Sequence, residues 1–285
     1  MTWLIGSLVF WVAAWLLNVW LANGPWRGRR AVRIAVPVIF GISLLVLWEG
    51  VVRGLQVSPV VLPAPSAIWA RIVQSFPILW QDFVQTAVKG AVSGYVIGCM
   101  AAFLVAILVD RKPFLKRGLL PIGSFVAALP IVGIAPIMVN WFGFGWESKA
   151  AVVVVMVFFP VLVNTVQGLD EASAMQRDLM RTYGAGYWQE LARLRLPAAM
   201  PFVFNGLKVA TTLALIGAIV AEYFGSPTYG MGFRISTEVG RLAIDMVWAE
   251  IAMAALAGSA FYGLVVLFEK WVTFWHPSQR NRAGD

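Results

Sequence analysis

Histidine, cysteine and charge are all scarce in this chain. Its 285 residues include one cysteine, Cys99, and one histidine, His276, and only 13% of them are Asp, Glu, Lys or Arg, against roughly 25% in an average soluble domain. A disulfide within the chain is excluded, and so is a metal site built from Cys and His. The sequence also contains no G-x-x-x-x-G-K-S/T loop, whose backbone cradles nucleotide phosphates. We therefore expect no cofactor on this chain, and no ATP bound in the usual way.

Apolar residues make up 60% of the sequence, and its mean hydropathy is +0.78. They gather in runs of about 20 residues, the length that a helix needs to cross a bilayer. A soluble all-α protein could bury one such run, but half a dozen leave too little polar surface to face water. The sequence therefore predicts an all-α, polytopic membrane protein. Seven spans are predicted, at residues 2–22, 33–52, 83–109, 118–140, 149–169, 198–222 and 247–272.

Basic residues are distributed unevenly between the predicted loops. The net charge of +8 could suit nucleic acid, but the charges lie in short loops between spans, where Lys and Arg mark the cytoplasmic side. The richest segments are residues 27–33, 111–117, 177–195 and 270–282. With seven spans, this alternation predicts an external N-terminus, a cytoplasmic C-terminus and no nucleic-acid partner.

Residues 1–32 are predicted to form an extra N-terminal span with an Arg-rich cytoplasmic linker, ahead of a transmembrane domain at residues 33–285. The first span could instead be a signal peptide. It has no basic segment before its apolar stretch, however, and its arginines follow that stretch, an order that favours a retained helix.

A predicted external segment, residues 61–80, has a different pattern. Pro63 and Pro65 favour an extended entry, and Ser66 is placed to cap a helix. Apolar residues then recur with helical spacing, which predicts an amphipathic helix on the outer membrane face. Packing against the other helices is its simplest role.

The loop at residues 170–197 is long, helix-forming and mixed in charge. Gly184 and Gly186 interrupt the helical pattern, and Pro197 is expected to stop it before the next span. We therefore predict a short helix, a glycine turn and a second short amphipathic helix with an exposed Trp188. Such a helix could dock into a groove on a soluble partner. A plain helical connector is the alternative.

This loop resembles the signature of the inner-membrane components of binding-protein-dependent ABC importers, which reads E-A-A, three residues, G, nine residues, I-x-L-P. Asp178-Leu179-Met180, Gly184 and Leu194-Arg195-Leu196-Pro197 have that spacing. Asp178 replaces the usual Glu, and Leu179 and Met180 replace two alanines. The resemblance implies that helix 186–194 couples to an ATPase. The coupling residues would be Asp178, Gly184, Trp188, Glu190, Leu191, Leu194 and Pro197.

The resemblance continues over residues 60–275, through LPAPSAIW (62–69), LPIVGIAP (129–136), WFGFGWESK (141–149) and LPAAMPFVFNGLKVA (196–210). These segments are similar to the nitrate, sulfonate and taurine type of permease. The similarity implies a six-helix type I core plus one extra helix, in the bacterial inner membrane. It also implies an external solute-binding protein, a second permease copy, and partner ATPase subunits that carry ATP and Mg. The suggested solutes are sulfonates, nitrate or taurine-like compounds, or pyrimidine precursors.

Several polar residues fall within the predicted spans, where they are costly and often mark a pathway or an interface. Lysine can also extend to the membrane surface, and threonine can bond to its own helix. The candidates for a translocation path are Lys89, Asn164, Lys208, Thr211, Thr212 and Glu222.

Two other function classes remain open from the residues alone. A stand-alone secondary transporter or channel would work without ATP and would not need the 170–197 loop, but the spans lack a chain of buried acids or histidines for proton coupling. A membrane-embedded enzyme would need clustered catalytic groups, which one histidine, one cysteine and scattered acids do not supply.

The predicted orientation can be tested by thiol labelling. In a Cys99→Ala background, single cysteines replace Gly28, Phe114, Gly145 and Gly230. Because positions 145 and 230 lie in predicted external loops, an impermeant thiol reagent added to intact cells should label 145 and 230 and spare 28 and 114. Labelling at 114 would reverse the orientation.

Overall fold

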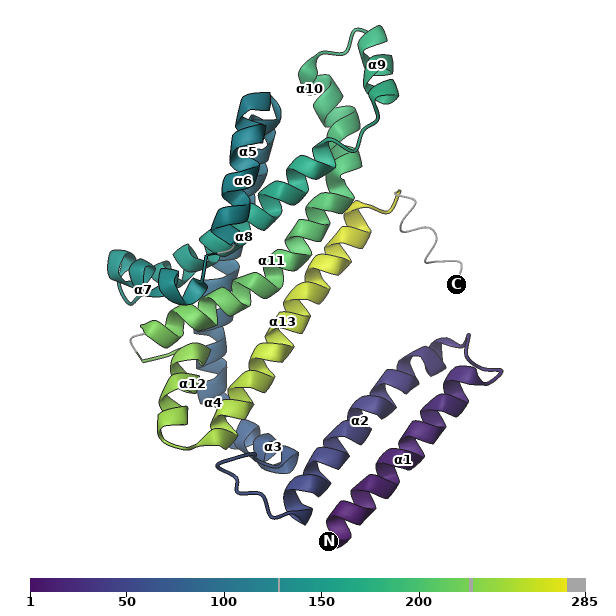
Figure 1. The fold of residues 1–285 in the computed structure, drawn as a ribbon, viewed down its shortest axis with the longest axis vertical. Helices are drawn as coiled ribbons and strands as arrows, with labels where there is room; N and C mark the ends of the chain where they lie inside the picture. Colours follow the sequence, from purple (N-terminus) through teal and green to yellow (C-terminus); the bar gives the residue numbers. More distant parts are fainter. Residues whose placement is uncertain (128, 226–227, 276–285) are drawn as a thin grey trace. The chain divides into compact units, whose positions relative to one another are not determined.

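The computed structural model describes residues 1–127, 129–225 and 228–275. Helices account for most of this part of the chain, which contains no strand (Figure 1). Six helical segments are long and apolar enough to cross a membrane, and each coincides with a predicted span. They are Thr2–Asn23, Arg30–Gly54, Phe76–Asp110, Trp146–Leu169, Tyr187–Phe224 and Ile244–Val272. The all-α prediction is confirmed. The described residues form two compact units, one of residues 1–79 and 235–252 and the other of residues 80–234 and 253–275.

The first unit contains the antiparallel pair α1 (Thr2–Asn23) and α2 (Arg30–Gly54). Small residues bring their backbones together: a Cβ atom added at Gly50 would overlap the Ser7 hydroxyl. Such contacts drive helix association in lipid, where burial of apolar surface provides little force.

The amphipathic helix predicted within residues 61–80 is present as α3 (Pro65–Gln74), but it is not capped by Ser66. Its N-cap is Ala64, and Pro65 occupies the first turn. The cap comes from α2 instead, because the Glu49 carboxylate accepts the Ser66 backbone N–H at 2.9 Å and the Ser66 hydroxyl at 2.7 Å. A carboxylate is favourable there, since free N–H groups and a positive dipole end meet at a helix N-terminus. At the other end, Arg71 pairs with Asp245 at 2.7 Å.

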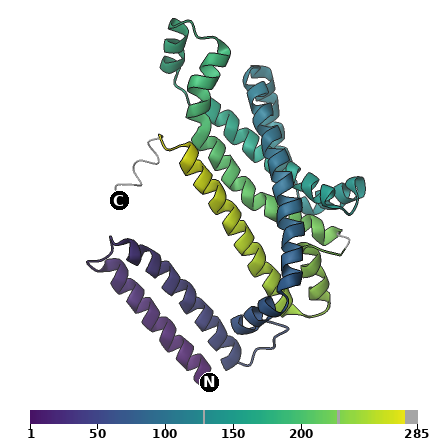
Figure 2. The same ribbon diagram turned by 180° about the vertical axis from the view of Figure 1, so that it is seen from behind.

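The second unit is built on a continuous rod followed by three long helices. The rod, seen along its length in Figure 2, consists of the last part of α4 (Phe76–Phe83), a π-helix η1 (Val84–Val92) and α5 (Ser93–Asp110). It packs against α8 (Trp146–Leu169), which packs against α11 (Leu196–Phe224). Gly98 permits this approach, because an added Cβ there would lie 2.5 Å from a Val157 methyl group. The later part of α13 (Ile244–Val272) completes the unit.

The predicted span at 118–140 is not a single helix. It is divided between α6 (Pro113–Ala127) and α7 (Ile131–Phe142). Pro130 has extended backbone angles, with ψ at 117°, so the helix cannot continue through it. The two pieces still carry the chain from one end of the unit to the other. Lys116 pairs with Asp170 at the end of α8, whereas Val139 lies against Gly225 at the end of α11.

A second correction concerns the helix expected at 186–194, which is not separate from the next span. α10 (Tyr187–Glu190) continues through a π-helix, η2 (Leu191–Arg195), directly into α11. Pro197 therefore lies inside a helical segment and does not stop it. The wide turn of η2 comes immediately before this residue, which has no N–H to donate and whose ring would crowd a normal preceding turn.

Candidate functional site

The segment between α8 and α11 forms a helical hairpin. α9 (Ala174–Thr182) begins with a capping box, in which Ser173 and Gln176 each accept the other's backbone N–H, at 3.3 and 3.0 Å. Gly184 follows α9 with φ at +72°, a conformation that glycine adopts without strain. The predicted glycine turn is confirmed.

The tip of this hairpin exposes large apolar side chains. α9 has no buried residue, and Figures 1 and 2 place it beyond the ends of α8 and α11. Met175, Leu179 and Tyr183 recur every fourth residue, which puts them on one face, and Trp188 stands on α10. Their exposed fractions are 82%, 57%, 81% and 58%, respectively. We call these four residues the tip surface.

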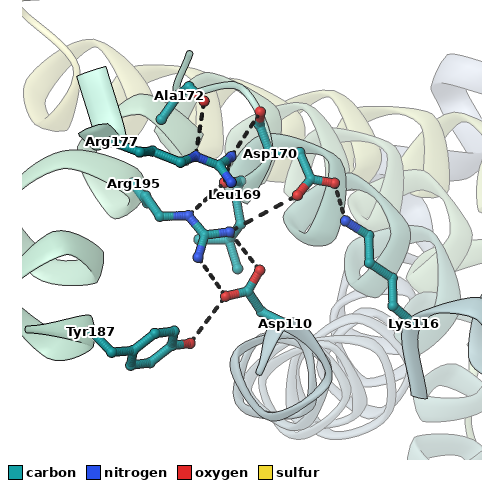
Figure 3. Close-up of polar contacts among 8 residues, drawn as sticks. All are labelled: Asp110, Lys116, Leu169, Asp170, Ala172, Arg177, Tyr187 and Arg195. Atoms are coloured by element: carbon teal, nitrogen blue, oxygen red, sulfur yellow. Dashed lines mark hydrogen bonds and ion pairs between the residues drawn. The ribbon is translucent and has the colours of Figure 1, made fainter. Parts of the chain in front are cut away.

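A buried ion pair holds the base of the hairpin (Figure 3). The Arg195 guanidinium donates to both oxygens of the Asp110 carboxylate, at 2.6 and 2.7 Å. The two side chains are only 7% and 3% exposed. The Tyr187 hydroxyl donates to the same carboxylate at 3.0 Å. The end of α5 is thereby joined to α10 and to the end of η2, which leads directly into α11.

The C-terminal end of α8 is tied to the same cluster, because its carbonyl groups have no partners within the helix. Arg195 Nε donates to the Leu169 carbonyl at 3.0 Å. Arg177, on α9, donates to the Ala172 and Asp170 carbonyls at 3.0 and 3.1 Å. Positive charge is also favourable at this end of a helix dipole.

Arg111 adds an aromatic contact to the base of the hairpin. Its guanidinium carbon lies 4.6 Å from the ring centroid of Tyr187 and 4.5 Å from that of Trp188, within the range of a cation–π interaction. The exposed Trp188 is therefore held in place by its neighbours before any partner is present.

The seven residues predicted for coupling do not share one surface. Asp178, Gly184 and Trp188 are exposed, and Leu194 and Pro197 are half-buried. Glu190 is buried and faces Arg181 at 3.9 Å. Leu191 is 2% exposed and packs with Leu169, so it cannot form part of a contact surface. It holds the hairpin against the helix ends instead.

The residues predicted for the path are not gathered in one place either. Lys208 pairs with Glu269 at 2.9 Å. Asn164 donates to the Pro160 carbonyl and accepts from Asn205. Thr211 bonds back to Lys208 on its own helix, while Lys89 and Thr212 are exposed.

Glu222 lies 14 residues after Lys208, which along α11 is about 21 Å, and it caps a different helix. α12 (Met231–Gly240) begins at three N–H groups, and each meets a side chain from another element. Gly230 donates to Asp82 at 2.7 Å, Met231 to Thr86 at 2.8 Å and Gly232 to Glu222 at 3.0 Å. Thr86 also donates to Glu222 at 2.7 Å.

Comparison with known proteins identifies the family. A family model described as the inner membrane component of binding-protein-dependent transport systems matches residues 94–274. The chain belongs to this family. It is the permease subunit of an ABC importer and a multi-pass inner-membrane protein.

Curated relatives share almost the whole length. The permease is 28% identical to a formylaminopyrimidine transport permease of Halalkalibacterium halodurans, over 88% of this chain and 100% of that one. It is also 28% identical to a riboflavin transport system permease of Chloroflexus aurantiacus, over 86% and 91% of the two chains. With a taurine transport system permease of Escherichia coli the identity is 25%, over 88% and 93%.

The residues that anchor the hairpin were not among the predicted site residues. Asp110 is the first charged residue after the third predicted span, and Arg195 separates two leucines just before the sixth. A charged residue at the end of a span needs no partner within the protein, because water or lipid headgroups can solvate it. Only the fold shows that two boundaries 85 residues apart meet.

The anchoring pair can be tested on the purified permease. Asp110→Ala leaves the Arg195 charge buried without its carboxylate, and should lower the free energy of unfolding by about 3–5 kcal/mol. Unfolding in detergent would measure the change. Asp178→Ala is the control, because its pair with Arg181 is exposed and should contribute less than about 1 kcal/mol. The double variant Asp110→Leu with Arg195→Met removes both charges and should recover most of the loss. Equal stability of Asp110→Ala and Asp178→Ala would contradict this account.

Proposed function

We propose that the permease receives the force of ATP hydrolysis through the tip surface of the α9–α10 hairpin. In this proposal, separate ATP-binding cassette subunits bind the tip from the cytoplasm, with ATP and Mg held by those subunits. This chain itself neither binds nor hydrolyses the nucleotide. The observation that carries the proposal is the apolar stripe of Met175, Leu179 and Tyr183, exposed on a helix that buries none of its own residues.

The stripe differs from the exposed apolar surface of the spans. Residues on α5 or α13 can face lipid, but α9 lies outside the six helical segments that could cross a membrane. An apolar stripe in water is unfavourable unless a partner covers it. The groove of a soluble protein that accepts one face of an amphipathic helix would do so.

Docking of the ATPase on the tip would not by itself couple the two proteins, because a flexible tip would move without displacing the spans. Here the tip is fixed at its base by the Asp110–Arg195 pair and by the bonds of Arg177 to the end of α8. Movement imposed on α9 would therefore be passed to α5, α8 and α11 together. This replaces the simpler idea that helix 186–194 docks as an independent element.

The remaining components follow from membership of a binding-protein-dependent family. We propose an external solute-binding protein and a second permease copy as partners, with the N-terminus of this chain outside and its C-terminus in the cytoplasm. The relatives named for formylaminopyrimidine, riboflavin and taurine support a small organic solute as the cargo. Whether Lys89, Thr212 and the other predicted path residues touch that solute stays a prediction.

The sharpest test uses two neighbouring glycines. Gly184 and Gly186 both have open space where a Cβ would be added, but only Gly184 has a positive φ. Gly184→Val should strain the backbone by on the order of 1–3 kcal/mol and tilt α9, whereas Gly186→Val, with φ at −77°, should be tolerated. We expect Gly184→Val to insert normally but to lose ATPase on co-purification, solute-stimulated hydrolysis and uptake.

A second pair of variants tests the tip surface directly. Leu179→Asp should abolish ATPase retention because it places a charge in the docked face, and Leu179→Met should preserve it. The permease without its partner is the blank, and no hydrolysis is expected from it. If Gly184→Val and Leu179→Asp both kept full ATPase binding and uptake, the hairpin would be a plain connector and the proposal would fail.

A further inference from the structure

The rod and the helix that contains α11 are linked at the base of the hairpin, and they are also joined at their far ends. Near the hairpin the link is the Asp110–Arg195 pair. At the far end, the Thr86 hydroxyl, on η1, donates to the Glu222 carboxylate, on α11, at 2.7 Å. Along its continuous helix, Glu222 lies about 40 Å from Arg195, which exceeds the roughly 30 Å hydrocarbon core of a bilayer. The two links therefore lie at opposite ends of the membrane-spanning part of these helices.

The start of α12 completes the contact at the far end. Thr86 accepts the Met231 N–H while it donates to Glu222, so one hydroxyl bridges α11 and α12. Glu222 accepts the Gly232 N–H with the same oxygen, Oε2. Gly230, with φ at +122°, allows so close an approach that an added Cβ would overlap the Glu222 carboxylate. Thr86 and Glu222 are at most 1% exposed. We call these two side chains the distal latch.

The distal latch is held less firmly than the base of the hairpin. At the base, two opposite charges share two hydrogen bonds. In the distal latch, a neutral hydroxyl meets a single carboxylate oxygen. The other oxygen, Glu222 Oε1, is buried and accepts no hydrogen bond from the described residues, and a buried acceptor without a partner costs free energy. Separation of α11 from the rod would open that oxygen to water and remove this cost.

The start of α12 is attached to the rod by a stronger contact. Asp82 is completely buried in the rod. It accepts the Gly230 N–H at 2.7 Å and pairs with Arg234 at 2.8 Å. An ion pair that is this well buried is costly to break. The start of α12 is therefore expected to stay with the rod when the bonds of Glu222 break, so that the end of α11 is the part released.

We propose that Glu222 is a positioning residue for transport, which holds α11 against the rod through Thr86 until solute enters. This rests on the proposed function, in which the hairpin lies in the cytoplasm and the distal latch therefore on the external side, where solute arrives. The base of the hairpin keeps the two helices joined at the ATPase, and the distal latch lets their far ends separate.

The opening of the distal latch can be measured on the purified permease alone. Ala218 lies one turn before Glu222 and is completely buried, so a cysteine there reacts with a water-soluble thiol reagent only when α11 opens. In a Cys99→Ala, Ala218→Cys background, Thr86→Val keeps the shape of the side chain and removes its hydroxyl. It should raise the labelling rate on the order of tenfold, because the lost bond is made to a charged group. Thr86→Ser keeps the hydroxyl and should leave the rate unchanged.

Two further measurements separate a latch from general loosening of the fold. The native Cys99, in permease without Ala218→Cys, is also buried and should label no faster with Thr86→Val. Gly230→Ala should displace the Glu222 carboxylate and speed labelling at position 218. Gly240→Ala, which has open space for its Cβ, should not. Equal rates at position 218 for Thr86→Val and Thr86→Ser would overturn the proposal, and so would equal rates for the two glycine variants if Thr86→Val failed to insert.

A disulfide across the same contact tests the need for opening. A Cβ atom added at Gly90 would lie 3.4 Å from the Ala218 Cβ, close to the separation of about 3.5–4.5 Å found in disulfides. In the permease assembled with its ATPase and binding protein, oxidation of Gly90→Cys with Ala218→Cys should lower ATP hydrolysis at least tenfold, and reduction should restore it. Unchanged hydrolysis with the disulfide fully formed would overturn the proposal. Failure of the tip surface would appear instead as ATPase retention by Leu179→Asp, and it would leave labelling at position 218 unaffected.

Discussion

Asp110 and Arg195 are each more than nine-tenths buried, and neither charge could remain in that environment without the other. Their pairing brings the end of α5 to the start of α11, and Arg195 adds the end of α8 by donating to the Leu169 carbonyl. The neighbouring ends of these three helices thus acquire a common fixed point. The α9–α10 hairpin stands on that point, and its orientation depends on it.

This arrangement separates two properties that coupling to a soluble motor requires. The base of the hairpin is polar, buried and bonded in several directions, which makes it stiff. The tip is apolar and exposed, and a stripe of this kind can enter a groove. Sequence reasoning combined both properties in helix 186–194, whereas in the structure Leu191 belongs to the stiff base and Leu179 to the exposed tip. At the other end of α11, a polar contact again joins two helices, because the Glu222 carboxylate accepts the Gly232 N–H at the start of α12.

Features set by local physics could be predicted from the sequence. The length of the apolar runs predicts the six spans. Gly184 predicts the turn between two short helices, because glycine adopts a positive φ without strain. Features set by tertiary contacts could not be predicted. Glu49 caps α3 in place of Ser66, and the helix runs through Pro197 because a π-turn precedes it. Hydropathy also predicts one continuous span across Pro130, because the segments on both sides of the break are apolar. The Asp110–Arg195 pair could not be predicted without knowing which span ends meet.

Site-specific photo-crosslinking tests the central claim most directly. Benzoylphenylalanine would replace Leu179 on α9 or, as the control, Leu264 on α13, which is similarly exposed, in the permease assembled with its ATPase. The account predicts that irradiation joins the permease to the ATPase from position 179 and not from position 264. An assembled complex that gave no ATPase product from position 179 would contradict it.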